Sequence, residues 1–171
     1  MVCDAQRLPF PSDAFGAAVS FEVIEHIPNV AQYLAEIKRV GAAALISTPN
    51  RALRLLPFQK PWNRYHLREY AAGDFAQTLA RVFARVQVRG ITATPAILEI
   101  EKRRVKQNPL TAYSKMFAQM LLPRAVRASA KRKPPHPTAP PAFSTNEYSA
   151  QDFFVTDETE ECINLLAVCT R

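Results

Sequence analysis

The chain has 171 residues, of which 48% are hydrophobic and 22% are charged, and these proportions are ordinary for a globular domain with a buried core. No apolar run approaches the roughly 18 residues that a membrane-spanning helix needs. The first residues lack the apolar region of a signal peptide. Cys3, Cys162 and Cys169 are far apart and match no metal-ligand spacing. We therefore expect a cytoplasmic protein with reduced thiols.

The net charge of +7 is concentrated in one segment, from Lys102 to Lys133, which contains no acidic residue. The favoured interpretation is a solvated, variable insertion. A second is a helix from Leu110 to Leu122 on a membrane surface, because Met, Phe and Leu residues there lie beside basic ones. Nucleic acid is not expected as a partner, because no aromatic residues alternate with the basic ones. The segment thus predicts at most a weak membrane-surface contact.

The first predicted elements are strands that end in polar residues. Residues 2–4 have the composition of a strand end, with Asp4 at its carboxyl end, and a loop with two prolines follows. Phe15 to Phe21 is a run of small and apolar residues, which predicts a strand buried on both faces. The ionisable residues of Glu22 to His26 follow it directly. Since ligands of open α/β sheets bind beyond the carboxyl ends of the strands, this turn is predicted to carry chemistry.

A helix and a second buried strand come next. Asn29 is a predicted N-cap, with Gln32 at the third position as in a variant capping box. Gly41 is predicted to end the helix as a C-terminal glycine, and Ala42 to Ser47 to form the strand. Strand, helix and strand in this order predict a parallel, right-handed crossover. The helix is indicated by apolar residues on one face: Val30, Tyr33, Leu34, Ile37 and Val40.

The remainder alternates regular and irregular segments. Arg51 to Tyr65 is predicted to be irregular, and the spacing of Phe75, Leu79 and Phe83 predicts a helix before a strand that ends near Gly90. A basic amphipathic helix is predicted to stop at Pro123. Two predictions complete the chain: disorder over 129–144, which is rich in Pro, Ala and Lys, and a strand over 162–169.

Four stretches of the chain form an ordered set of motifs: Cys3-Asp4-Ala5-Gln6-Arg7-Leu8-Pro9-Phe10, Val19-Ser20-Phe21-Glu22-Val23-Ile24-Glu25-His26-Ile27, Ile46-Ser47-Thr48-Pro49-Asn50-Arg51 and His66-Leu67-Arg68-Glu69-Tyr70 with Asp74-Phe75. In this order they resemble the class I S-adenosylmethionine-dependent methyltransferases, and in particular the methyltransferase type 11 group. The match covers about half of the chain. The resemblance implies a Rossmann-like α/β sheet with helices on both faces and transfer of a methyl group from S-adenosylmethionine to a small-molecule acceptor.

The same resemblance implies roles for individual residues. Asp4 would accept a hydrogen bond from the adenine amino group and the Ala5 amide would meet a ring nitrogen, an acceptor beside a donor. The alternative for Asp4 is a turn aspartate that caps its own backbone. The cofactor's methionine part would face Ser20, Phe21 and Glu22. Glu25 and His26 would border the transferable methyl as the catalytic residues. His26 is a candidate general base, because an imidazole changes charge near neutral pH.

Parts of the family pattern are missing from this sequence. The chain has four glycines, at 16, 41, 73 and 90, and no Gly-x-Gly-x-Gly turn. The loop before the predicted second buried strand is short. We expect an N-terminally truncated domain that lacks the first two strands. Its predicted parts are the later half of the core (1–100), a basic, Pro-rich insertion (101–145) and the end of the core with the last strand (146–171).

Other interpretations remain open at this stage. In a helical turn, Glu22, Glu25 and His26 would share a face that can bind a divalent metal, with His66 as a fourth ligand. A similar Glu-x-x-Glu-His occurs in small-RNA ribose 2′-O-methyltransferases and quinone-biosynthesis O-methyltransferases, where it holds magnesium or a related ion. The favoured interpretation is the superfamily's generic post-strand motif, with Glu25 capping and no metal. The alternative to an enzyme is a non-catalytic, methyltransferase-like remnant or interaction protein.

Overall fold

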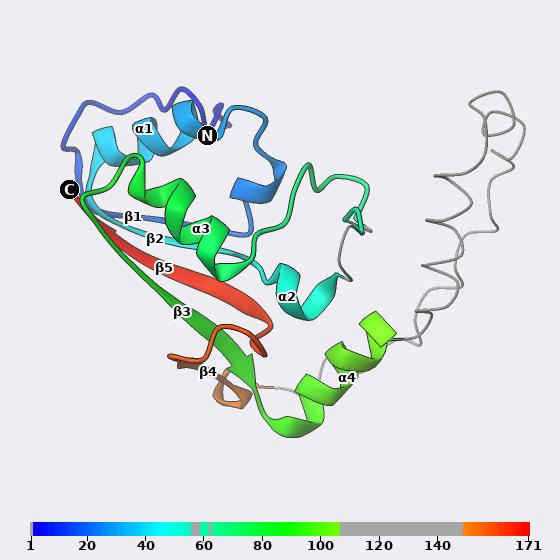
Figure 1. Cartoon of the computed structure of the whole chain (residues 1–171). Coiled ribbons are helices and arrows are strands. Elements are labelled where there is room, and N and C mark those ends of the chain that lie inside the picture. Colours follow the sequence, from blue (N-terminus) through cyan, green and yellow to red (C-terminus); the bar gives the residue numbers. More distant parts are fainter. Residues whose placement is uncertain (1, 56–58, 62, 107–148) are drawn as a thin grey trace, which may run out of the picture.

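The computed structural model describes residues 2–55, 59–61, 63–106 and 149–171, and its centre is a five-stranded sheet with helices packed on it (Figure 1). Among these residues, no helix has the length and apolar character needed to cross a membrane. The elements, in chain order, are β1 (Phe15–Phe21), η1 (Ile24–His26), α1 (Val30–Val40), β2 (Gly41–Pro49), α2 (Arg51–Arg54), α3 (Ala72–Ala80), β3 (Arg85–Ala93), α4 (Pro95–Lys106), η2 (Ala150–Asp152), β4 (Phe153–Thr156) and β5 (Asn164–Thr170).

The strand order is β1-β2-β5-β3-β4, so the last strand in sequence lies in the middle of the sheet. β1 and β2 are parallel and are joined through α1, as the predicted crossover requires. β5 is antiparallel to both β2 and β3, and β4 is antiparallel to β3. The predicted α/β class is confirmed, with a sheet of mixed strand direction.

Helix α1 has the bounds that its sequence predicts. The Asn29 side chain accepts a hydrogen bond from the Gln32 backbone N–H at 3.2 Å, which confirms the N-cap. The reciprocal half of the capping box does not form, because the Gln32 side chain donates to the Gln6 carbonyl at 3.4 Å instead. Gly41 is extended, with φ −122°, rather than left-handed as a C-terminal glycine would be. Its small size matters because a Cβ there would lie 3.1 Å from the Ala18 nitrogen.

The hydrophobic core lies between one face of the sheet and helices α1 and α3, which are on the same side in Figure 1. Alternate residues of β2 and β5 point into this core, as the two-residue period of a strand requires. The buried members are Ile24, Val30, Tyr33, Leu34, Ile37, Ala44, Ile46, Tyr70, Phe75, Leu79, Phe83, Cys162, Leu165, Ala167 and Cys169.

The opposite face of β1 is exposed, so the prediction that this strand is buried on both faces is wrong. Phe15, Val19 and Phe21 are 42%, 64% and 55% exposed. In the strand register, Val19 pairs with Leu45 and Leu45 with Val168, which places three apolar side chains in one row across β1, β2 and β5. In the described part of the chain, β1 is an edge strand with one apolar face toward solvent.

Other segments differ from the sequence-based expectation in detail. Residues 2–4 form no strand and lead into a turn. The irregular segment contains the short helix α2, and β3 extends three residues beyond Gly90. Neither α4 nor β4 was expected. The predicted helix at 110–121 and the predicted disorder at 129–144 lie outside the described residues, and the division at 100/101 falls inside α4.

Candidate functional site

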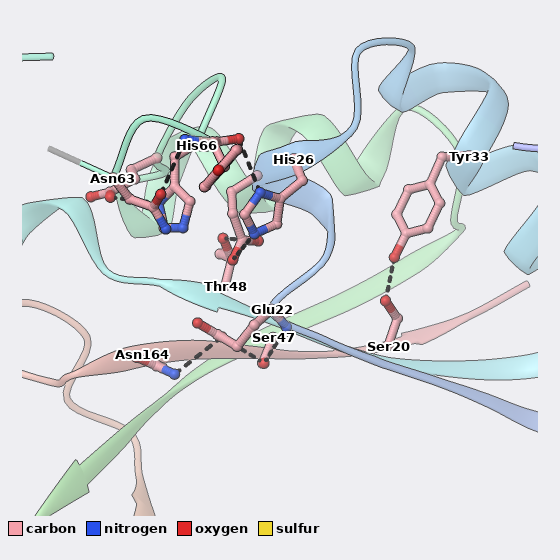
Figure 2. Close-up of polar contacts among 12 residues, drawn as sticks. Ser20, Glu22, His26, Tyr33, Ser47, Thr48, Asn63, His66 and Asn164 are labelled. Carbon is pink, nitrogen blue, oxygen red and sulfur yellow. Dashed lines mark hydrogen bonds and ion pairs between the residues drawn. The ribbon is translucent and has the colours of Figure 1, made fainter. Parts of the chain in front are cut away.

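Polar side chains gather where β1 and β2 end (Figure 2). Parallel neighbours bring their carboxyl ends to the same edge of a sheet. Glu22 follows β1 directly, η1 holds Glu25 and His26, and Ser47 and Thr48 are in the last residues of β2. The strand topology thus places chemistry-bearing residues from two segments together.

Glu22 is held against the sheet. Its φ of +55° is the left-handed conformation, which turns the chain sharply after β1. Ser47 Oγ and Asn164 Nδ2 both donate to its Oε1, at 2.9 and 3.1 Å. Burial raises the pKa of this carboxyl, and the hydrogen bond from Ser47 opposes the rise. The Glu22 carboxyl therefore points across β2 toward β5.

Glu25 points the other way and is fully buried. Thr48 Oγ1 donates to its Oε2 at 3.2 Å. Its Oε1 has no hydrogen-bond partner among the described residues and lies 3.9 Å from His26 Nε2. A buried carboxylate oxygen without a partner is costly in free energy, so this atom marks a place where a cation or a hydrogen-bond donor of a ligand would be stabilised.

Two histidines lie beside this carboxyl. The rings of His26 and His66 are in T-shaped contact with centroids 4.7 Å apart. His26 Nδ1 is 3.0 Å from the Tyr65 carbonyl oxygen, and His66 Nδ1 is 2.8 Å from a carboxylate oxygen of Glu69. Since both partners are acceptors, each Nδ1 carries the hydrogen, and each Nε2 is left with a lone pair.

A backbone contact explains how His66 reaches a turn forty residues earlier. The Leu67 N–H donates to the Glu25 carbonyl at 2.9 Å. The Asn63 side chain accepts from the Tyr65 N–H at 3.0 Å, which shapes the loop before it. The side chain of His66 is 6% exposed and that of His26 is 38% exposed, so the pair is open to solvent on the His26 side.

The three ionisable residues of the turn do not share a face. Glu22 has left-handed backbone geometry and lies before the 3-10 turn, so only Glu25 and His26 are in η1. The arrangement that a helical turn would give is therefore wrong for Glu22. Glu25 and His26 come together with His66, which the sequence suggested as a partner.

The predicted cofactor-binding residues have diverse surroundings. Asp4 Oδ1 accepts a hydrogen bond from the Gln6 N–H at 2.8 Å, so this carboxyl does cap its own turn. The Gln6 carbonyl accepts a hydrogen bond from the Gln32 side chain at the start of α1. Ala5 packs on the core. The Ser20 hydroxyl is hydrogen-bonded to the Tyr33 hydroxyl, and Phe21 is exposed. Cofactor binding by these residues stays a prediction.

Two important polar residues were not singled out from the sequence. Asn50 is fully buried and donates from Nδ2 to the carbonyls of Thr159 and Cys162, at 2.8 and 2.9 Å. Its Oδ1 accepts from the Ala52 N–H, as an N-cap of α2 does, and an asparagine before a helix is the available signal. Glu69 accepts a hydrogen bond from His66 and so orients its ring. The spacing of three residues between His66 and Glu69 is only a weak sign of this contact in the sequence.

Comparison with known proteins finds one family model and several relatives that parts of this chain resemble. The family model described as Methyltransferase domain matches residues 1–43. A probable S-adenosylmethionine-dependent methyltransferase of Mycolicibacterium smegmatis is 32% identical over 101 residues, which are 57% of this chain and 39% of that protein. Over these residues the chain is similar to S-adenosylmethionine-dependent methyltransferases. A second relative with the same description, Rv3030 of Mycobacterium tuberculosis, is 29% identical over 107 residues, or 60% of this chain and 39% of that protein.

The fold of the chain has a counterpart among solved structures. A Thermotoga maritima structure, described as an S-adenosylmethionine-dependent methyltransferase and possible histamine N-methyltransferase, matches with a TM-score of 0.54. The sequence identity is 10%, and the match covers 97% of this chain and 60% of that one. The Rossmann-like expectation is thereby confirmed. The chain spans 39% of the length of the curated relatives described above.

Proposed function

We propose that this chain acts in the transfer of a methyl group from S-adenosylmethionine to a small-molecule acceptor, at the carboxyl ends of β1 and β2. The supporting observation is that the family match over residues 1–43 contains the Asp4 turn, β1 and the Glu25-His26 turn. Of these segments, the end of β1 and the turn after it carry Glu22 and His26, which lie with Ser47 and Thr48 at one edge of the sheet (Figure 2). Ligands of open α/β sheets bind at such edges.

The residues present fit one end of the cofactor. Asp4 keeps an exposed carboxylate beside the backbone of Ala5, an acceptor-donor pair that suits the edge of adenine. Ser20, Phe21 and Glu22 continue along the end of β1 and would border the methionine part. Bound S-adenosylmethionine supplies an electrophilic methyl group.

The chain's own residues can receive the proton of an acceptor. The Tyr65 carbonyl fixes the His26 ring through Nδ1, so Nε2 keeps a lone pair on a side chain that is 38% exposed. Glu25 Oε1, at 3.9 Å, would stabilise the imidazolium that forms. Positioning supplies the remainder of the catalytic effect, because methyl transfer needs the acceptor in line with the methyl group.

Calorimetry with S-adenosylmethionine tests the proposal. We expect saturable binding that is weakened in Asp4→Ala and unchanged in Asp74→Ala, an exposed aspartate in the first turn of α3. His26→Gln should leave cofactor binding intact. Absence of binding at millimolar cofactor would overturn the proposal for this chain.

The alternative is a non-catalytic interaction protein of the same fold, and one observation favours it. Val19, Leu45 and Val168 form an apolar row on the face of the sheet opposite α1 and α3, with Val19 64% exposed among the described residues. Exposed apolar surface of this kind commonly marks contact sites. The alternative predicts no cofactor binding in the same calorimetric titration.

A further inference from the structure

The cluster formed by Glu25, His26 and His66 has the composition of a metal site. One ligand atom from each residue lies within 4.8 Å of the ligand atoms of the other two. Two imidazoles and one carboxylate suit a divalent first-row transition ion better than magnesium, which prefers oxygen ligands. We infer that these three residues bind one such ion.

The unpartnered oxygen is the first argument for this site. Glu25 is fully buried, and its Oε1 has no hydrogen-bond partner although Oε2 accepts from Thr48. A cation at Oε1 offsets the desolvation of this carboxylate, which the described surroundings leave uncompensated. The orphan oxygen lies 3.9 Å from His26 Nε2, and the His26 ring in turn contacts the His66 ring.

The orientation of the imidazoles is the second argument. A metal-binding histidine usually donates its other ring N–H to a carboxylate or a backbone carbonyl, which fixes the ring and the tautomer. His26 has the Tyr65 carbonyl at 3.0 Å in this role, and His66 has Glu69 at 2.8 Å. Both Nε2 lone pairs are therefore available for an ion, and Glu69 is a positioning residue rather than a ligand.

The geometry allows ligation after small movements. Zinc lies about 2.0–2.2 Å from nitrogen and oxygen ligands, so the three ligand atoms must draw together by roughly 1 Å. His26 can make this movement because its side chain is 38% exposed, and the same exposure gives an ion a route from solvent. Three protein ligands leave open positions for water or for an acceptor, as in catalytic rather than structural metal sites.

This inference does not rest on the proposed methyl transfer, because metal binding is measured without S-adenosylmethionine. It does bear on that function, since a bound ion would occupy the His26 lone pair assigned above to proton acceptance. In calorimetry, loss of cofactor binding with intact metal binding would remove the proposed function alone. Cofactor binding without metal binding would remove this inference alone.

The experiment is a titration of the chelator-treated full chain with Co²⁺ and with Zn²⁺. Co²⁺ is followed by its visible absorption, and Zn²⁺ by competition with a chromophoric chelator. We expect one ion per chain. Binding should weaken at least tenfold in Glu25→Gln and in His66→Ala, and about 10–100-fold in Glu69→Gln, because the partner of a ligating histidine tunes its affinity. The third histidine provides a matched control, and His136→Ala should bind as the parent does.

A stability measurement keeps the test independent of folding defects. Saturating Zn²⁺ should raise the midpoint of thermal unfolding of the parent and of His136→Ala, because the ion binds the folded state. It should not raise that of Glu25→Gln, whose folded state is checked by circular dichroism. Absence of saturable binding, or binding that survives Glu25→Gln and His66→Ala together, would overturn the inference. Loss of binding in His136→Ala or Cys3→Ser would also overturn it, by placing the ion elsewhere.

Discussion

Replacement of Gly90 by alanine should destabilise the fold more than any other glycine substitution in the described chain. Gly90 lies in β3, paired with Leu165 of β5 and with Thr156 of β4, and the connection between β4 and β5 passes over it. A Cβ at this position would be 2.1 Å from the Glu158 carbonyl oxygen and 2.7 Å from the Cys162 Cβ. The first of these contacts is with backbone, which cannot rotate away as a side chain does.

The magnitude follows from the required displacement. An ordinary carbon–oxygen contact is about 3.2 Å or longer, so the connection or the strand must move by roughly 1 Å. Overpacking of this kind costs typically 1–3 kcal/mol, occasionally more, and the backbone contact places Gly90→Ala at the upper end, about 3 kcal/mol. For a chain of this size that corresponds to a fall of roughly 6–12 °C in the unfolding midpoint.

The assay is thermal and urea unfolding followed by far-UV circular dichroism. Gly16→Ala is the matched control, because it is also in a strand and a Cβ there meets nothing within 4 Å. It should be neutral or stabilising by up to about 1 kcal/mol, since alanine reduces the freedom of the unfolded chain. A Gly90→Ala variant within about 0.5 kcal/mol of Gly16→Ala would refute the reasoning.

Three further predictions concern stability. Leu34→Ala removes a fully buried side chain of α1 and should cost about 2–5 kcal/mol in urea unfolding; a loss below about 1 kcal/mol would contradict the packing described. Asn50→Ala leaves the carbonyls of Thr159 and Cys162 without their shared donor and should cost about 1–3 kcal/mol, which parent-like unfolding would disprove. The hydrogen bond from Arg39 lowers the pKa of Glu36 to about 2. The ionised Glu36 carboxylate therefore stabilises the fold at any pH above its ordinary pKa of 4.5, and this stabilisation is lost as the pH falls through about 2. The Glu36→Gln variant should be less stable than the parent at pH 7, and the stabilities of the two proteins should converge near pH 2. Parallel stability curves for these two proteins would exclude this linkage.

Features that depend on neighbouring residues were predicted well. Helix α1 has the predicted N-cap and bounds, because the apolar face from Val30 to Val40 and the Asn29 cap are both encoded within one helix. The parallel pairing of β1 and β2 follows from the same segment, since a helix between two strands requires a crossover.

Features set by distant segments were predicted less well. Whether the outer face of β1 is covered depends on what packs there, and the apolar sequence of Phe15 to Phe21 cannot show it. The opposite directions of Glu22 and Glu25 depend on a single left-handed residue, and the i, i+3 spacing gives no sign of it. The short strand β4 contains Phe153 to Thr156 and lacks a clear alternation, so pairing with β3 decides its structure.

At the candidate site, sequence reasoning found the ionisable groups but not their arrangement. Glu25, His26 and His66 could be named because their motif is short and recognisable. The roles of Tyr65 and Glu69 come from a backbone carbonyl and a loop conformation, which are tertiary features. Burial of Glu25 with one oxygen unpartnered could be established only from the packed structure.

The central position of β5 has a consequence for how the chain is made. During synthesis, β1, α1 and β2 leave the ribosome well before Asn164–Thr170, yet β2 and β3 meet only through that strand. Until it emerges, the two sides of the sheet have no ladder between them. Ala43 of β2 pairs with Thr170 of β5, so most of the chain lies in the loop between the two paired residues. Strand pairing between residues so far apart in the sequence is slow. Completion of this sheet therefore waits for the synthesis of β5. Until then, β2 and β3 each keep one unpaired strand edge that chaperones can recognise.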